Sequence, residues 1–410
     1  MKKIRACQRT GSQRRKQTGH TALRLRNFFG GLKKIGLLLL TVCLLLPMTG
    51  CWNYRGLNEL TIVAGVAIDK IENQYLLSFE IMDMSKPVKQ EGVTSRMIQA
   101  EGKSIFDAIR NAKNQLASTL YFGNVQIVVI SQEIAREDGL HTIMDFFLRD
   151  PEMRETIRVV IPQQPQAWEI LDVKQKDGSA VAYGIVQIIR DNSKTVGATI
   201  DKPLYLMYQE LYTPGSSLTL PAFHVGSSDP MNPSFAEANG TAVFQGDKLA
   251  GFLSSSETKY LLLGRNELKG GLLTMYLPDI APHNLSLEIS RTSCKLSHRE
   301  VDGKLTIRME VYVEAFLADY PHKKMRDTQM VIDPIQNGAE ELIQESMADL
   351  IQKTQTKYHA DIIGFGDYIY RHDLALWNQI QDDWDTRYRD LSVEIVPTVH
   401  ILNSAMLYQE

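Results

Sequence analysis

Hydrophobic residues along the chain follow two spacings, and each spacing predicts a different kind of element. Short runs rich in β-branched residues and bounded by polar turns predict strands at 60–69, 75–81, 125–130 and 156–161. The polar stretch 83–97, which contains Pro87 and Gly92, predicts a loop. Strands that alternate with helical segments indicate a domain of the α/β or α+β class.

Apolar residues three and four positions apart predict the helices between these strands. Ser104 is a candidate N-cap for a helix that runs to about Thr119, and 133–148 predicts a second helix. The apolar stripe of the first helix consists of Ile105, Ala108, Ile109, Ala112 and Leu116. A long amphipathic helix is predicted over 335–358. Each of these helices has one apolar face with which to cover a sheet.

A stretch rich in proline, glycine and serine at 213–235 predicts a domain boundary. It separates an N-terminal α/β-type region, 51–225, from a C-terminal α+β region, 236–410. In the second region, Gly246-Asp247 and Asp302-Gly303 each predict the turn of a β-hairpin. A last strand alternates apolar and polar residues, with apolar side chains at Leu391, Val393, Ile395, Val399 and Ile401.

The first fifty residues have the layout of a secretory signal peptide. They carry eleven Lys and Arg and no Asp or Glu, and an apolar run follows from Ile35 to Leu46. This run is shorter than the roughly 20 apolar residues that a membrane-spanning helix needs, and Pro47 disfavours its continuation. We therefore predict that 1–50 is removed. Because Leu32-Lys33-Lys34-Ile35 reads as the start of a signal peptide, we expect translation to begin near Leu32, and residues 1–31 to be absent.

Met48-Thr49-Gly50-Cys51 resembles the lipobox of bacterial lipoproteins. The Cys51 thiol would form a thioether with a diacylglyceryl group, and the small residues before it would let a peptidase close on the backbone. The resemblance implies S-diacylglycerol and N-palmitoyl modification of Cys51. A single acyl chain anchors a protein only marginally, whereas two chains hold it stably at a membrane.

The charge of the chain changes when residues 1–50 are left out. The remainder has 34 Lys and Arg against 48 Asp and Glu, a net charge of about −14. This argues against a nucleic-acid partner and against a broad electrostatic contact with anionic lipids. Cys294 is the remaining cysteine besides Cys51, so no intrachain disulfide is expected, and its strand-like neighbours predict a core or half-buried thiol.

The sequence contains no convincing catalytic or metal-binding constellation, so we predict no enzyme activity, no metal and no cofactor. G-x-S-x-G, P-loop, H-E-x-x-H and paired C-x-x-C motifs are all missing. The acids Asp382, Asp383 and Asp385 predict a solvated helix face rather than a cation site. Gly364-Phe365-Gly366 predicts a turn. Trp377 and Trp384, seven residues apart, predict core packing on one face of a helix.

Several segments resemble one family, the Ger(x)C family of C-subunit lipoproteins of spore germinant receptors. They extend in order along the chain and are 50–60 with 66–70, 120–124, 145–154, 240–244 with 247–249 and 257–258, and 360–366 with 368–371, Trp377 and Trp384. The first reads Gly50-Cys51-Trp52-Asn53-Tyr54-Arg55-Gly56-Leu57-Asn58-Glu59-Leu60. Asn53 and Gly56 depart from the Asp and Glu usual in the family, and neither touches the lipid chemistry.

The resemblance implies an α+β, multi-domain fold of mixed β-sheets with flanking helices. It also implies a non-catalytic subunit that works with two integral-membrane subunits, of the A and B type, in the response of a dormant spore to nutrients. The subunit would be lipid-anchored on the outer face of the inner spore membrane. The alternative is a solute-binding lipoprotein of an uptake system, which shares the anchor and a two-domain body. An anchored hydrolase would need a nucleophile–base pair, which the sequence does not offer.

Overall fold

The computed structural model describes residues 36–37, 41, 59–82, 94–149, 151–173, 179–226, 234–278, 280, 283–301, 304–319 and 328–402. The predicted lipobox with Cys51, nearly all of the predicted signal peptide and most of the predicted loop 83–97 lie outside these residues. Residues 58–410 form one compact unit. Among the described residues, no helix combines the length and the hydropathy needed to cross a bilayer.

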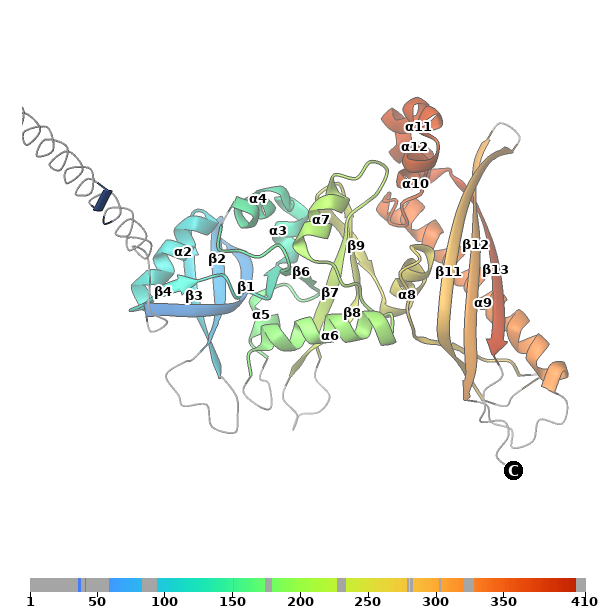
Figure 1. Cartoon of the computed structure of the whole chain (residues 1–410), viewed down its shortest axis with the longest axis horizontal. Helices are drawn as coiled ribbons and strands as arrows, with labels where there is room; N and C mark the ends of the chain where they lie inside the picture. The colour runs from blue at the N-terminus through green and yellow to red at the C-terminus, as the bar shows by residue number, and fades with distance from the viewer. Residues whose placement is uncertain are drawn as a thin grey trace, which may run out of the picture. The chain divides into compact units, whose positions relative to one another are not determined.

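A nine-stranded mixed sheet forms the first part of this unit (Figure 1). Its strands are β1 (Leu60–Ile71), β2 (Gln74–Met82), β3 (Ser95–Gly102), β4 (Thr119–Tyr121), β5 (Ile127–Ile130), β6 (Arg158–Pro162), β7 (Thr219–Gly226), β8 (Phe235–Gln245) and β9 (Lys248–Leu253). The strand order is β3-β2-β1-β5-β6-β7-β8-β9, and β4 pairs with the start of β1. The strands from β1 through β5 and β6 to β7 run parallel, and both ends of the sheet are antiparallel.

Helices cover both faces of this sheet (Figure 1). One face packs against α2 (Ile105–Ala112), α3 (Gln132–Glu137), α4 (His141–Arg149) and α7 (Leu204–Leu211). The other face packs against α5 (Trp168–Leu171) and α6 (Val181–Thr195). Because both faces are covered, the central strands β5 and β6 are buried along their whole length, as is typical of parallel strands.

Two predicted helices are shorter than the apolar pattern indicated. The helix predicted over 104–119 ends at Ala112, and a short 3₁₀ turn, η3 (Lys113–Gln115), follows it. Thr119 then starts β4, because pairing with Leu60 of β1 outweighs the local helical pattern. The helix predicted over 133–148 is broken into α3 and α4 at Gly139, which adopts a φ of +78° and closes α3 through its N–H.

Pairing between strands also corrects the predicted loop and bears on the predicted boundary. Ser95–Gln99, which includes the end of the predicted loop, pairs with β2 as part of β3. The proline-rich stretch 213–235 contains β7, which pairs with both β6 and β8. Pro221 lies at an irregularity in the β7–β8 register, where a proline is tolerated in a sheet. The sheet therefore continues across the predicted boundary, and the division into 51–225 and 236–410 stays a prediction.

A four-stranded sheet forms the second part, in the order β10-β11-β12-β13. Its strands are β10 (Leu272–Met275), β11 (Leu285–Val301), β12 (Lys304–Asp319) and β13 (Ser392–Leu402). The two predicted hairpins are confirmed, because β8 pairs with β9 and β11 pairs with β12 on either side of the expected turns. The predicted α+β fold with mixed sheets and flanking helices is confirmed as well.

One face of the second sheet packs against the long helix α9 (Thr328–Lys353). This helix starts earlier than predicted and ends in a π-helical turn, η4 (Thr354–Tyr358). A small helical group follows η4, made of α10 (Phe365–His372), α11 (Leu374–Ile380), η5 (Gln381–Asp383) and α12 (Trp384–Arg389). The helix α8 (Ser255–Gly264), from earlier in the chain, packs against α9 and β8. Together these elements bury a core that reaches from α8 to β13.

Side chains of α9 cover the open edge of β13. The N–H groups of Val399 and Ile401 donate to the side-chain oxygens of Glu340 and Gln336, at 2.9 and 3.1 Å. Pro397 has no N–H, so it leaves no further donor at the same edge position. The last strand, β13, is therefore held on one edge by parallel pairing with β12 and on the other edge by side chains of α9.

We predict that Ile395→Asp unfolds the C-terminal part of the chain. The Ile395 side chain is 8% exposed, so the change buries an unpaired carboxylate. Such burial costs several kcal/mol against a total stability of about 5–15 kcal/mol. Thr398→Asp, on the exposed face of the same strand, is the matched control and should melt like the parent. Thermal unfolding of a chain that starts at Trp52 tests this, and equal melting of both variants would contradict burial of the strand.

Candidate functional site

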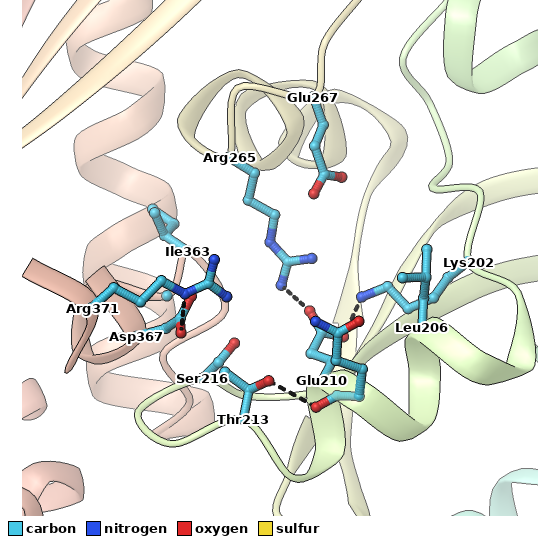
Figure 2. A pocket seen from close by; sticks show the side chains of 12 residues that line it. Lys202, Leu206, Glu210, Thr213, Ser216, Arg265, Glu267, Ile363, Asp367 and Arg371 are labelled. Carbon is cyan, nitrogen blue, oxygen red and sulfur yellow. Dashed lines mark hydrogen bonds and ion pairs between the residues drawn. The ribbon is translucent and has the colours of Figure 1, made fainter. Parts of the chain in front are cut away.

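Three charged side chains meet where the first sheet contacts the C-terminal part, and we call them the junction cluster: Lys202, Glu210 and Arg265. The Lys202 ammonium contacts the Glu210 carboxylate and also donates to Thr219 Oγ1 at 3.0 Å. The Arg265 guanidinium lies 2.9 Å from Glu210 Oε1 and donates to the Ile362 carbonyl oxygen at 2.5 Å. One carboxylate therefore holds two buried cations that come from different parts of the chain (Figure 2).

Local structure places each of these groups. Lys202 directly precedes Pro203, which is the N-cap of α7, and Glu210 stands near the end of the same helix. Arg265 is the C-cap of α8, whose first turn is closed by a capping box between Ser254 and Glu257. The Arg265 N–H also donates to the Leu261 and Leu263 carbonyls at the end of α8, so the backbone holds Arg265 in place, whereas Pro203 gives α7 no side-chain cap.

Burial and charge together set the ionisation of the cluster. Burial lowers the pKa of Lys202 to about 8, although the neighbouring carboxylate of Glu210 opposes this shift. Burial alone would raise the pKa of Glu210, but Arg265 and Lys202 outweigh it, and the pKa of Glu210 is lowered. The carboxylate therefore stays charged at neutral pH and balances the cations that face it.

A second contact joins the same two parts of the chain through backbone atoms. The Ser217 N–H donates to the Asp361 carbonyl at 2.9 Å, and the Asp367 N–H donates to the Gly215 carbonyl at 3.1 Å. Gly215 and Gly366 make this approach possible, because a Cβ on Gly366 would lie 2.6 Å from the Cα of Gly215. The contact therefore requires glycine at these positions.

The Asp361 carboxylate organises the start of α10. It is 4% exposed and accepts from the N–H groups of Gly364, Phe365 and Gly366, at 2.8, 3.1 and 2.9 Å. Burial raises the pKa of Asp361 to about 6, and the three backbone donors oppose the shift. Gly364 adopts a φ of +89°, so the predicted turn at Gly364-Phe365-Gly366 is confirmed and leads directly into α10.

A pocket of about 330 Å³ opens beside the junction cluster, between α7 and α10 (Figure 2). Its walls carry both signs of charge, because Glu267 and the Asp367–Arg371 ion pair line it together with the cluster. Among the described residues, no group of three His, Cys, Asp or Glu side chains is placed to hold a metal ion. The chemistry offered by this site is ionic and hydrogen-bonded contact.

The other candidate residues from the sequence lie as follows. Cys294 is half-buried on β11, and burial raises the pKa of its thiol to about 11, which confirms the predicted half-buried thiol. The predicted solvated face is confirmed, because its acids Asp382, Asp383 and Asp385 are all exposed. Trp377 and Trp384 are buried with ring centroids 5.7 Å apart, which confirms core packing, but they belong to α11 and α12 rather than to one helix.

The junction cluster was not predicted from the sequence. One signal was available, since Glu210 is the only charged residue in α7, whose sequence is Leu-Tyr-Leu-Met-Tyr-Gln-Glu-Leu. A lone charge in such a helix suggests a partner elsewhere in the fold. The partner itself could not be identified, because Arg265 lies 55 residues further along the chain.

The arrangement of two mixed sheets is shared with a solved structure. The crystal structure of the GerBC protein aligns with a TM-score of 0.53 at 17% identity, over 83% of this chain and 97% of that chain. This likeness shows a common fold. The protein therefore belongs to the class of multi-domain α+β proteins that this structure represents.

Family models and relatives identify the family. The model for the spore germination protein N-terminal domain matches residues 53–225, and the model for the spore germination B3/GerAC-like C-terminal part matches 239–405. The chain belongs to this spore germination family, and the resemblance seen in its sequence is confirmed. Spore germination protein KC of Bacillus subtilis (strain 168) is 24% identical over 91% of this chain and 96% of its own length. Spore germination protein A3 of the same organism is also 24% identical, over 87% and 93%.

We predict that Glu210→Gln destabilises the protein by about 3 kcal/mol, because it leaves Lys202 and Arg265 buried without a balancing charge. Glu267→Gln makes the same change of charge at an exposed residue of the same pocket and should cost less than about 0.5 kcal/mol. Urea unfolding of the two variants measures the difference. Equal stability of the two would show that the cluster does not hold the junction together.

Proposed function

We propose that the protein is a lipid-anchored subunit of a nutrient germinant receptor, with a non-catalytic role in assembly and coupling. The observation that carries this proposal is the match of two spore germination family models, which together extend from residue 53 to residue 405. Relatives named as spore germination proteins cover nearly the same length. The first family model ends at residue 225 and the second begins at residue 239. These limits lie near the predicted boundary and support 51–225 and 236–410 as the two domains.

The anchor follows from the lipobox, with S-diacylglycerol and N-palmitoyl groups on Cys51. The protein would lie on the outer face of the inner spore membrane, beside integral-membrane subunits of the A and B type. A tether confines the folded part near the bilayer, and this raises its effective concentration at membrane partners. Strong intrinsic affinity for these partners is then not required.

The coupling role is supported by the junction. Two independent contacts, the junction cluster and the backbone contact between Gly215 and Gly366, hold the first sheet against the C-terminal part. A rigid connection of this kind can carry a displacement from one partner-binding region to another. No covalent chemistry is needed for that role.

We predict that Cys51→Ala prevents lipid attachment, because no other residue of Met48-Thr49-Gly50-Cys51 carries the thiol that the lipid needs. The protein should then either leave the membrane fraction or stay there as a larger, uncleaved species. Membrane fractionation with intact-mass analysis distinguishes these forms. Membrane-bound protein of mature size in the Cys51→Ala strain would show that the lipobox assignment is wrong.

We predict that Gly366→Ala weakens the nutrient response of the spore without releasing the protein from its membrane. The added Cβ lies 2.6 Å from Gly215 and 2.7 Å from Trp384, so the backbone contact must open. Gly264→Ala is the matched control, since its Cβ meets only side-chain atoms at 3.4 Å or more. Germination would be followed with nutrients and with a non-nutrient trigger, and protein levels would be checked by immunoblot.

Two results would contradict the coupling role. One is a normal nutrient response in spores that carry Gly366→Ala, when hydrogen exchange of the variant protein shows that the backbone contact between Gly215 and Gly366 has opened. The other is saturable binding of a nutrient to the purified chain in calorimetry, near the concentration that triggers germination. The second result would favour direct sensing or solute binding instead.

A further inference from the structure

We infer that the outward face of α2 and η3 contacts the anionic headgroups of a lipid bilayer. We call it the basic face, and it consists of Lys103, Phe106, Arg110 and Lys113. The inference rests on the proposed lipid anchor at Cys51, and it adds the orientation of the folded part on the membrane.

The spacing of three of these residues places them on one side of the helical segment. Phe106, Arg110 and Lys113 are four and three positions apart, which is the repeat of a single helical face, and Lys103 directly precedes the N-cap Ser104. All four side chains are exposed, and Phe106 is 55% exposed. The opposite side of α2 is buried against β2 and β3 through Ile105, Ala108 and Ala112. The helix is therefore held by its apolar side and leaves the basic face to a partner.

The chemistry of the basic face suits an interfacial position. The Arg110 guanidinium lies 4.8 Å from the centroid of the Phe106 ring, so an apolar ring and a cation are presented together. Basic residues near a membrane surface are attracted by anionic headgroups, and an exposed aromatic ring beside them adds an apolar contact. Asp107 is turned back toward the start of the helix, where its carboxylate accepts from the Lys103 N–H at 2.9 Å.

The charge of this face differs from that of the rest of the protein. Residues 51–410 carry a net charge of about −14, yet 94–121 contains four basic and two acidic residues. Exposed acids dominate elsewhere, for example on α3 with Glu133 and Glu137 and on η5 with Asp382 and Asp383. A local basic face on an acidic protein orients it toward an anionic surface, while the remaining surface is repelled.

The basic face also lies near the point at which the chain reaches the anchor. The segment that follows η3 forms β4, and Thr119 pairs with Leu60 at the start of β1. The hydroxyl groups of Thr61 and Ser118 are hydrogen-bonded as well. Eight residues lie between Cys51 and Leu60, and the nine Cα–Cα steps of a fully extended chain over this stretch span at most about 32 Å. The tether therefore keeps this corner of the fold within reach of the bilayer.

Vesicle binding by the chain from Trp52, which lacks the lipid and contains the whole compact unit 58–410, tests the inference. It should bind vesicles with anionic headgroups better than vesicles of neutral phosphatidylcholine, and high salt should weaken the binding. Each basic residue near an anionic surface contributes roughly fivefold to partitioning. Reversal of Lys103, Arg110 and Lys113 to Glu should therefore weaken binding at least about 100-fold.

The matched control reverses three exposed lysines on other elements, Lys248, Lys269 and Lys304, to Glu. It changes the net charge by the same amount and should retain most of the binding. Equal loss in both triple variants, or equal binding of the parent to anionic and neutral vesicles, would overturn the inference. The test does not use Cys51, so its failure would leave the proposed anchor and receptor role standing, whereas the fractionation of Cys51→Ala tests the anchor alone.

A second measurement uses the full lipidated chain in anionic vesicles. A fluorophore attached at Phe106→Cys should be quenched by headgroup-labelled lipid, and one at Lys269→Cys should not. Equal quenching at both positions would also overturn the inference. If Phe106→Cys is shielded only when the membrane subunits are present, the basic face binds protein rather than lipid.

Discussion

The ion pair between Glu210 and Arg265 is the interaction on which the arrangement of the two sheets depends. Glu210 belongs to α7, which packs on the first sheet, and Arg265 ends α8, which packs against β8 of the first sheet and against β11 of the second sheet. Lys202 shares the same carboxylate, so the loss of Glu210 would expose two cations to each other in a buried site. Removal of one partner of a buried ion pair is strongly destabilising, because it leaves an uncompensated charge in the protein interior.

Buried carboxylates also position three of the helices. Asp69 accepts from the N–H groups of Ala167 and Trp168 at the start of α5, at 2.6 and 3.1 Å. Glu80 accepts from those of Val181 and Ala182 at the start of α6, at 2.6 and 2.9 Å. Asp361 does the same for α10. In each case an acidic residue satisfies free N–H groups of a helix N-terminus, where the helix dipole favours negative charge. Asp69 and Glu80 are distant in sequence from the helices they cap, whereas Asp361 lies a few residues before α10.

Side chains from helices cover the outer edges of both sheets. Asn111 and Gln115 donate to carbonyl groups of β3 at 2.8 and 2.6 Å, and Arg136 and Tyr358 do so for β9 at 3.2 and 2.6 Å. At the edge strand β13, the side chains of Glu340 and Gln336 on α9 accept hydrogen bonds from backbone N–H groups in the same way. Edges covered in this way are poor templates for pairing with another strand. Contacts with partners are then expected to use helix faces, and the basic face on α2 is one such surface.

The sequence by itself determined the elements whose signals are local. The strands β1 and β2, the hairpins around Gly246 and Asp302, and the alternating burial of the last strand follow from apolar spacing and turn residues within a few positions of each other. The family segments are likewise read directly from the chain, and the resemblance of Met48-Thr49-Gly50-Cys51 to a lipobox is a local pattern of the same kind.

Only the tertiary structure decided the features that depend on distant partners. Residues after Ala112 leave the helix because Thr119 pairs with Leu60, and Ser95 becomes part of a strand because β2 lies beside it. The junction cluster joins Glu210 to Arg265, and a backbone contact joins Gly215 to Gly366 across some 150 positions. Local propensity is worth less than about 1 kcal/mol per residue. Strand pairing, burial and charge balance between distant segments therefore outweigh local secondary-structure propensity. No local sequence pattern indicates which distant segments will come into contact.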